Sequence, residues 1–118
     1  MNTLNMNDID KLAKRASKAA HDLGVAKAEL ADAKARLKAE TATLLAAAYS
    51  DGIIIGKNAD QRHQSETAYV ETHPILDDYR LDVKRKEENA IDAETEAVYI
   101  DTYIKLLRAA LYAISNKS

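Results

Sequence analysis

The stretch IDKLAKRASKAAHDLGVAKAELADAKARLKAETATLLAA, residues 9–47, decides the fold. It contains no proline and one glycine, and it is rich in Ala, Leu and Lys, which are strong helix formers. Apolar residues recur alternately three and four positions apart, the spacing of a coiled-coil seam. The pattern predicts a helix over about 8–49. Its seam positions are Ile9, Leu12, Ala16, Ala19, Leu23, Ala26, Leu30, Ala33, Leu37, Leu44 and Ala47, with Glu40 as the polar exception.

The C-terminal part of the chain repeats this pattern. Pro74 suits the first turn of a helix, because amides in that turn have no acceptor within the helix and proline, which lacks the amide hydrogen, loses no hydrogen bond there. Heptads then continue without a break, which predicts a second long helix over about 75–115. The seam positions are Leu76, Tyr79, Val83, Ala90, Ala93, Ala97, Ile100, Ile104, Leu107, Leu111 and Ile114, with Lys86 as the polar exception.

Between the two heptad segments lies SDGIIIGKNADQR, residues 50–62. Gly52 can adopt the left-handed conformation that ends a helix, so residues 50–58 are predicted to form a loop. Asn58 can cap a short helix over about 59–71, with Gln61 at the third position. The side chains of the three isoleucines at 53–55 are predicted to be shielded from solvent, either packed under this short helix or in a contact between protomers.

Together these elements predict an all-α fold over 1–118, a single helical domain shaped as a long antiparallel coiled-coil hairpin. Our expected register places Ile9 opposite Ile114 and Leu23 opposite Ile100. Glu40 and Lys86 then fall in neighbouring layers, where they either form a diagonal ion pair or both extend to solvent.

Each long helix also carries a second apolar stripe that a two-helix hairpin would leave uncovered. Contiguous apolar surface of that extent is seldom left exposed, so the stripes predict a homo-oligomer in the form of a helical bundle or ring. The predicted oligomer interface comprises Ala28, Ala31, Ala35, Ala39, Ala42, Tyr99, Tyr103, Leu106 and Ala110.

Composition narrows the functional classes. The chain is 47% hydrophobic and 31% charged, proportions typical of a folded domain. Because it has no cysteine, it can form no disulfide and no thiolate metal site. Neither a signal peptide nor a run of about 18 apolar residues is present, so we expect a soluble cytoplasmic protein that does not contact membranes.

Motifs for catalysis or cofactor binding are weak. The GKN tripeptide at 56–58 lacks the preceding glycine and the following Ser or Thr of a phosphate-binding loop. His63 with Glu66 and His73 with Asp77 have helical ligand spacing, but such pairs are common by chance on polar segments. We therefore expect no enzymatic activity, no cofactor and no bound metal.

Basic residues form a stripe over two turns of the first predicted helix, at Lys11, Lys14, Arg15 and Lys18. In an oligomer, copies of this stripe could hold the backbone of a single-stranded nucleic acid while tyrosines stack on its bases. In the alternative interpretation these cations serve solubility and pair with nearby carboxylates, such as Asp10 with Lys14.

The order AAAYSDG, GKNADQR and a final helix of alternating acidic and apolar residues resembles small helical proteins of tailed phages and prophages that share a GKN-type turn. The layout also resembles the recombination mediator proteins of tailed phages, which are helical, form rings, bind single-stranded DNA and help to load a recombinase. The resemblance implies phosphate contacts for Lys57 and Arg62 as well as for the Lys11–Lys18 stripe. Mediators of this type are expected to be basic, whereas this chain has a formal net charge of -2.

The leading hypothesis is therefore a non-enzymatic, oligomeric accessory protein of DNA recombination that binds single-stranded DNA and a recombinase in the cytoplasm of a phage-infected host. In a second hypothesis the chain is a protein-binding inhibitor of a host defence complex, whose acidic second half covers a basic site on its target. A purely structural coiled-coil assembly protein is the third.

Overall fold

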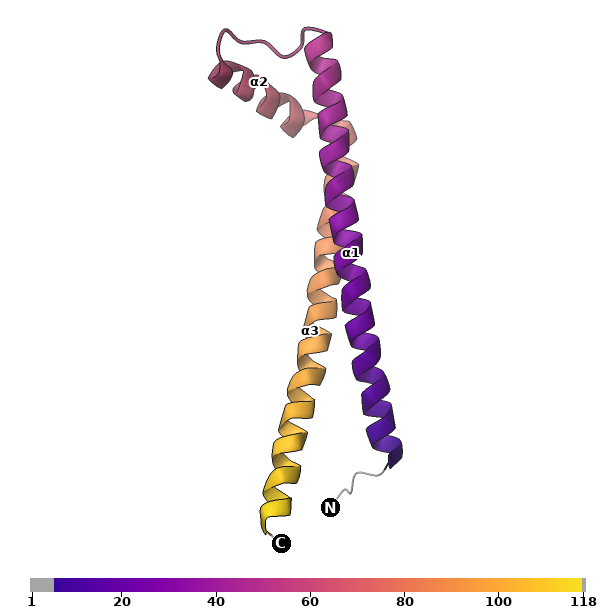
Figure 1. The fold of residues 1–118 in the computed structure, drawn as a ribbon. Helices are drawn as coiled ribbons and strands as arrows, with labels where there is room; N and C mark the ends of the chain where they lie inside the picture. Colours follow the sequence, from indigo (N-terminus) through magenta and orange to yellow (C-terminus); the bar gives the residue numbers. More distant parts are fainter. Residues whose placement is uncertain (1–5, 118) are drawn as a thin grey trace. The chain divides into compact units, whose positions relative to one another are not determined.

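The computed structural model describes residues 6–117, except for the side chain of Lys117. It contains helices α1 (Met6–Ser50), α2 (Ala59–Thr72) and α3 (Pro74–Lys117), drawn in Figure 1. Each begins and ends within two residues of its predicted bounds, and the described residues contain no strand. The all-α fold is thus confirmed. No helix in this part of the chain is both long and apolar enough to cross a membrane.

The contacts of the chain divide into two compact units. Unit 1 joins the first part of α1, up to Ala28, to the part of α3 that begins at Glu88, whereas unit 2 spans Glu29–Glu87. In unit 1, Leu12 shares a cleft with Tyr103, and Ala19 shares one with Ala97. Higher numbers on one helix therefore meet lower numbers on the other, so the two segments run antiparallel, as the sequence predicts.

The predicted seams supply most of the buried side chains of both units, and Ala48 and Ile54 in unit 2 are buried outside them. Ala19, Ala26 and Ile100 are buried in unit 1, and Ala33 and Leu76 in unit 2. Most remaining seam positions are half-buried, including the polar exceptions Glu40 and Lys86. Small alanine side chains let the helix backbones approach closely, and this explains how a chain without Phe or Trp still packs. The exposed exceptions are Ile9, Ala47, Leu111 and Ile114.

The expected register is wrong by about one heptad. Ile100 was expected opposite Leu23, but it shares a cleft with Ala16 and Ala19 instead. Lys86 forms an ion pair with Glu29 at 3.6 Å, so the expected pair with Glu40 is absent. The physical reason is that a strict heptad repeat matches apolar residues equally well after a shift of seven positions. Periodicity predicts the face of each helix, but it does not choose between such registers.

The end of α1 is closed by a double hydrogen-bonded turn. Gly52 has φ 73°, and the amides of Ile53 and Gly52 donate to the carbonyls of Ala48 and Tyr49 at 2.9 and 3.2 Å. This is the Schellman arrangement, in which glycine takes the left-handed position. Of the three isoleucines only Ile54 is buried, while Ile53 and Ile55 are 50% and 70% exposed. The expectation that all three side chains are shielded from solvent is therefore wrong within the single chain.

The short helix α2 begins at the predicted cap. Asn58 Oδ1 accepts a hydrogen bond from the amide of Gln61 at 2.9 Å, and Gln61 Oε1 accepts one from the amide of Lys57 at 2.8 Å. Helix α2 has no buried residue. In Figure 1 it lies at an angle to the other helical segments of unit 2. Polar groups hold it: Tyr49 donates to Glu66, Arg80 to the carbonyl of Val70, and the amide of Ile55 to Ser65 Oγ.

Candidate nucleic-acid interface

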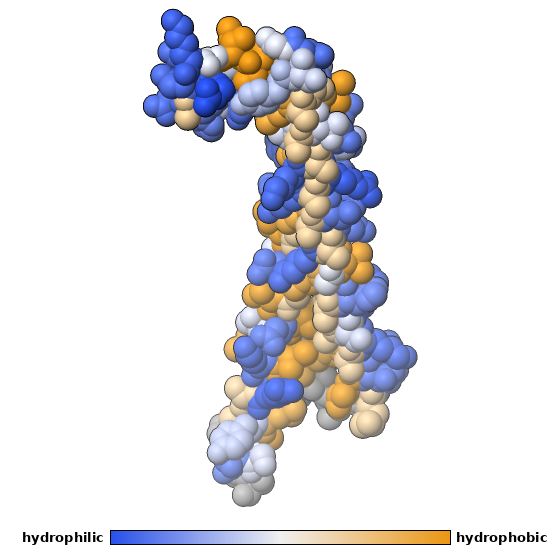
Figure 2. Space-filling model, turned by 45° about the horizontal axis from the view of Figure 1, so that its top comes forward, coloured by the Kyte–Doolittle hydropathy of each residue, from blue (hydrophilic) through white to orange (hydrophobic). Residues whose placement is uncertain are grey.

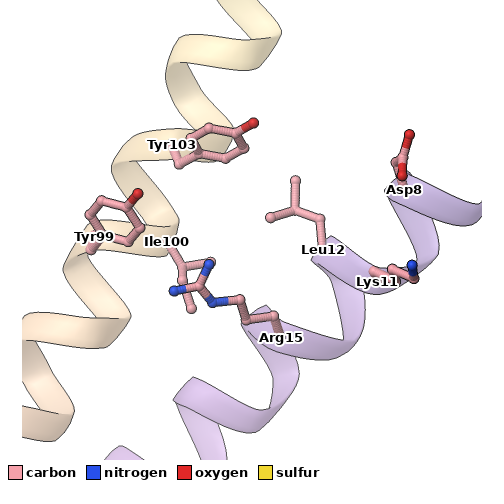
Figure 3. Close-up of a pocket in the computed structure, with 7 residues that line it drawn as sticks. All are labelled: Asp8, Lys11, Leu12, Arg15, Tyr99, Ile100 and Tyr103. Carbon is pink, nitrogen blue, oxygen red and sulfur yellow. The ribbon is translucent and has the colours of Figure 1, made fainter. Parts of the chain in front are cut away.

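A cleft in unit 1 brings two of the predicted DNA-binding cations together with two tyrosines. It has a volume of about 350 Å³. Figure 3 shows Leu12 and Arg15 reaching from α1 toward α3, and Tyr99 and Tyr103 projecting from neighbouring turns of α3. Leu12 and Ile100 contribute apolar side chains to the lining. The complete lining is Asp8, Lys11, Leu12, Arg15, Tyr99, Ile100 and Tyr103.

Arg15 is the most highly connected side chain of the cleft. Its Nε and Nη2 donate to Glu96 Oε1 at 3.1 and 2.7 Å, and its guanidinium carbon lies 5.6 Å from the centre of the Tyr99 ring. The hydrogen bonds to Glu96 raise the pKa of Arg15, so the side chain stays charged under all ordinary conditions. A planar guanidinium held against an aromatic ring forms a flat surface that carries positive charge.

The other two cations of the basic stripe are paired locally. Lys14 Nζ lies 3.1 Å from Asp10, and Lys18 Nζ lies 3.2 Å from Asp22, each four residues apart on α1. The predicted solubility pairing between Asp10 and Lys14 is thus confirmed. Exposed pairs of this kind add little stability, but each carboxylate lowers the positive potential of the helix face. As a result, the structure divides the stripe by position: Lys11 and Arg15 line the cleft, where Arg15 is paired with Glu96, and the other two lie outside it beside acids on α1.

Lys57 and Arg62 belong to unit 2, where the GKN turn has a structural explanation. A Cβ on Gly56 would lie 2.6 Å from the amide nitrogen of Arg62, so only glycine fits there. The residues that follow supply the hydrogen bonds that cap α2. Gly56, Asn58 and Gln61 therefore each have a role in folding. The geometry assigns no ligand to the side chains of Lys57 and Arg62.

The nine residues of the predicted oligomer interface are all exposed in the single chain. Two of them, Tyr99 and Tyr103, are 57% and 47% exposed and line the cleft. The sequence pattern paired the basic stripe with stacking tyrosines only in general terms, and it assigned Tyr99 and Tyr103 to the oligomer interface because residues were grouped one helix at a time. A search of helix pairs in every heptad-related register would have found the combination.

The histidines considered as metal ligands have other surroundings. His73 ends α2, accepts a hydrogen bond from the amide of Ile75 at its Nδ1 (3.3 Å), and contacts the Tyr69 ring edge-on at 5.1 Å. Within the described residues, no group of three or more His, Cys, Asp or Glu side chains is arranged to hold a metal ion. His73 therefore acts in the turn between α2 and α3.

Comparison of the chain with known protein families, with curated proteins and with solved structures found no match. The chemistry of the cleft is therefore the guide to function. Two cations, of which Arg15 is paired with Glu96, two partly exposed phenol rings and the apolar side chains of Leu12 and Ile100 favour a ligand that is anionic at one edge and flat and apolar at another. A nucleotide within a single strand has both properties.

Proposed function

We propose that the protein acts by binding, and that unit 1 binds single-stranded DNA in the cleft between α1 and α3. The observation that carries this proposal is the combination of Lys11 and Arg15 with Tyr99 and Tyr103 in one cleft. Stacking of a base on an aromatic side chain is tolerant of sequence because every base has a π-face. The cations contact the adjoining phosphates. Binding then falls steeply as salt rises, because each phosphate contact releases condensed counterions.

The biological setting follows from the resemblance to tailed-phage proteins. We propose a self-associating accessory protein of DNA recombination, which presents several clefts to one strand and brings a recombinase to it. Association is an essential part of the proposal because a single cleft is small and much of the charge around it is balanced. Repeating the cleft multiplies the weak affinity of one site through effective concentration.

The test is fluorescence anisotropy of a labelled oligothymidine at low and moderate salt. Removing one stacking ring with Tyr103→Ala removes about 1–3 kcal/mol of binding free energy, which raises Kd roughly five- to 150-fold. Arg36→Ala is a control outside the cleft, because Arg36 is an exposed cation paired with Asp32 in unit 2. Wild type and control bind equally at low salt, and both release the strand as salt rises.

Two results contradict DNA binding at the cleft. One is an absence of salt-sensitive binding at low ionic strength. The other is equal binding by wild type and Tyr103→Ala. Circular dichroism of each variant separates loss of a contact from loss of the fold, since Tyr103 is about half exposed and its removal leaves the buried seam intact.

A second candidate is a protein-binding inhibitor of a host complex. The specific observation in its favour is the local pairing of Lys14 and Lys18 with carboxylates, which lowers the attraction for nucleic acid. Residues 59–118 carry more acidic than basic side chains, and Asp77 and Asp78 are exposed on α3. Such a surface suits a basic site on a partner protein. Failure to bind the oligonucleotide at any salt concentration would favour this candidate.

A further inference from the structure

The contact between Arg15 and Glu96 joins the two helices of unit 1 beside the cleft. Arg15 Nε and Nη2 on α1 both donate to Glu96 Oε1 on α3, at 3.1 and 2.7 Å. Arg15 lines the cleft, whereas Glu96 is not part of the lining. Glu96 precedes Tyr99 by three residues, a spacing that makes the two side chains neighbours on the surface of α3. A phosphate that approaches Arg15 therefore meets a cation that a carboxylate already holds.

The geometry of the guanidinium group makes the two anions rivals. The donors Nε–H and Nη2–H point from one edge of the planar group, and such an edge matches the oxygens of a carboxylate or a phosphate. Glu96 takes both donors of that edge in Arg15. A phosphate gains this edge only by displacing Glu96. At the opposite edge it would still lie within a Debye length of the carboxylate, about 10 Å at 0.1 M salt, and would be repelled.

The contact is exposed enough to open. The side chains of Arg15 and Glu96 are 53% and 48% exposed. Ion pairs in such surroundings contribute little to stability, because water solvates both partners once they separate. Arg15 can therefore exchange its carboxylate for a phosphate without disturbing the buried seam. The exchange still has a cost, because it leaves the charge of Glu96 unpaired next to the bound strand.

The rest of unit 1 does little to offset that cost. The chain has a formal net charge of -2, and Lys14 and Lys18 are already paired with carboxylates. On the face shown in Figure 2, hydrophilic side chains are interspersed with apolar ones along the helices. Attraction for a phosphate backbone thus depends on the cations that line the cleft, Lys11 and Arg15. Whatever occupies Arg15 has a direct effect on that attraction.

We propose that Glu96 competes with the phosphates of a bound strand for Arg15, and that this autoinhibitory contact keeps the affinity of each cleft low. The competition concerns the regulation of the same cleft and so rests on the proposed function. Glu96 touches no part of the strand itself. It acts through Arg15, by the charge that it places beside the phosphate.

The test is fluorescence anisotropy of the labelled oligothymidine with Glu96→Gln over a series of salt concentrations. Glutamine keeps the length of the side chain and an acceptor oxygen for Arg15 but removes the charge. We expect Kd at low salt to fall roughly two- to fivefold, the effect of removing one exposed ion pair that the strand has to break. The slope of log affinity against log salt steepens by about 0.7 per cleft, because the contact of Arg15 with phosphate no longer leaves a carboxylate unpaired.

Asp32→Asn is the matched control. It makes the same change in net charge, and it frees another arginine, Arg36, whose Nη2 lies 2.8 Å from Asp32. Arg36 is not part of the cleft lining. We expect Kd and the salt slope of this variant to stay close to those of wild type. Circular dichroism verifies that both variants keep their helical content.

Three results overturn the competition while DNA binding at the cleft stands: equal binding by wild type and Glu96→Gln, weaker binding by Glu96→Gln, and an equal gain in Asp32→Asn. Weaker binding would make Glu96 a clamp that orients Arg15 for the strand. Absence of binding by both wild type and Glu96→Gln overturns the proposed function together with the competition.

A measurement without DNA examines the contact by itself. The Nε proton resonance of Arg15 is followed by NMR spectroscopy and assigned by its absence from Arg15→Lys. We expect this resonance to shift between wild type and Glu96→Gln, because its hydrogen bond changes from a charged acceptor to a neutral one. An identical position in both chains shows that the contact does not form in solution, and this overturns the competition whatever the strand does.

Discussion

Gly56 lies where the backbone leaves no room for a side chain. Its φ is 158°, and a Cβ would approach the amide nitrogen of Arg62 to 2.6 Å and the backbone carbon of Gln61 to 2.9 Å. We expect Gly56→Ala to destabilise the start of α2 by about 1–3 kcal/mol, since backbone must shift to admit the methyl group. Urea denaturation followed by circular dichroism measures the change.

Gly24 is the matched control for this substitution. It lies inside α1, where an added Cβ meets nothing within 4 Å. Gly24→Ala should therefore stabilise the chain by roughly 0.5–1 kcal/mol, the gain expected from alanine in a helix interior. If both substitutions changed stability in the same direction, the conformational argument for Gly56 would be wrong.

Tyr49 provides a pH-dependent signal for the attachment of α2. Its hydroxyl donates to Glu66, and this hydrogen bond raises the pKa of Tyr49 above its ordinary value. The stability from this bond is fully present below about pH 10, where the tyrosine is neutral in both folded and unfolded chains. It is lost as pH rises through the raised pKa. We expect the tyrosinate absorbance of Tyr49, obtained as wild type minus Tyr49→Phe, to rise at a higher pH than that of a free tyrosine.

Glu66→Gln provides the control for this titration. The amide retains an acceptor oxygen for the Tyr49 hydroxyl but removes the carboxylate charge, so the pKa of Tyr49 should fall back toward its ordinary value. An identical titration curve for Tyr49 in wild type and Glu66→Gln would show that the contact with α2 does not form in solution.

At the scale of the helix, the alanine-rich seam determines how closely α1 and α3 pack. Ala33 is 3% exposed and belongs to unit 2. We expect Ala33→Leu to lower the free energy of unfolding by about 1–3 kcal/mol, because the extra methylenes force the helices apart. The midpoint of chemical denaturation measures this loss.

Ala35 is the control for overpacking, since it lies two residues away on the same helix and is exposed. Leucine is also a strong helix former, so Ala35→Leu should leave stability nearly unchanged. Unchanged stability of Ala33→Leu would contradict the assignment of Ala33 to the seam. A loss in Ala35→Leu as large as in Ala33→Leu would show that position 35 is covered as well.

Helix α2 differs from the long helices in how it is held. No residue of α2 is buried, and Tyr49 of α1 and Arg80 of α3 each form a hydrogen bond with it. Polar contacts at an exposed surface contribute less than buried apolar area. The element most open to local unfolding is thus α2, and its amide hydrogens should exchange before those of the seam.

At the scale of the molecule, self-association should appear in thermal stability. If copies of the chain associate, as the proposed function requires, mass action makes the midpoint of unfolding rise with protein concentration. We expect such a rise for the wild-type chain. Scanning calorimetry over a hundred-fold range of protein concentration measures this rise in the unfolding midpoint. Such a range changes the free energy of association by about 2.7 kcal/mol. A constant midpoint in wild type would count against pairing.

The sequence by itself determined the three helices, their bounds to within two residues, and the face that each long helix buries. Those properties depend on local propensity and on heptad spacing, which any segment carries regardless of its partner. The cap at Asn58 and the helix stop at Gly52 were predictable for the same reason.

Only the tertiary structure decided the register, and the register decided the candidate sites. Because a heptad repeat fits equally well after a shift of seven residues, the pattern could not indicate that Lys86 meets Glu29. Nor could it bring Arg15 to Tyr99 or leave Leu111 without a partner. Contacts between distant segments depend on which of several similar alignments has the lowest free energy, and that choice is made by the packing of the whole chain.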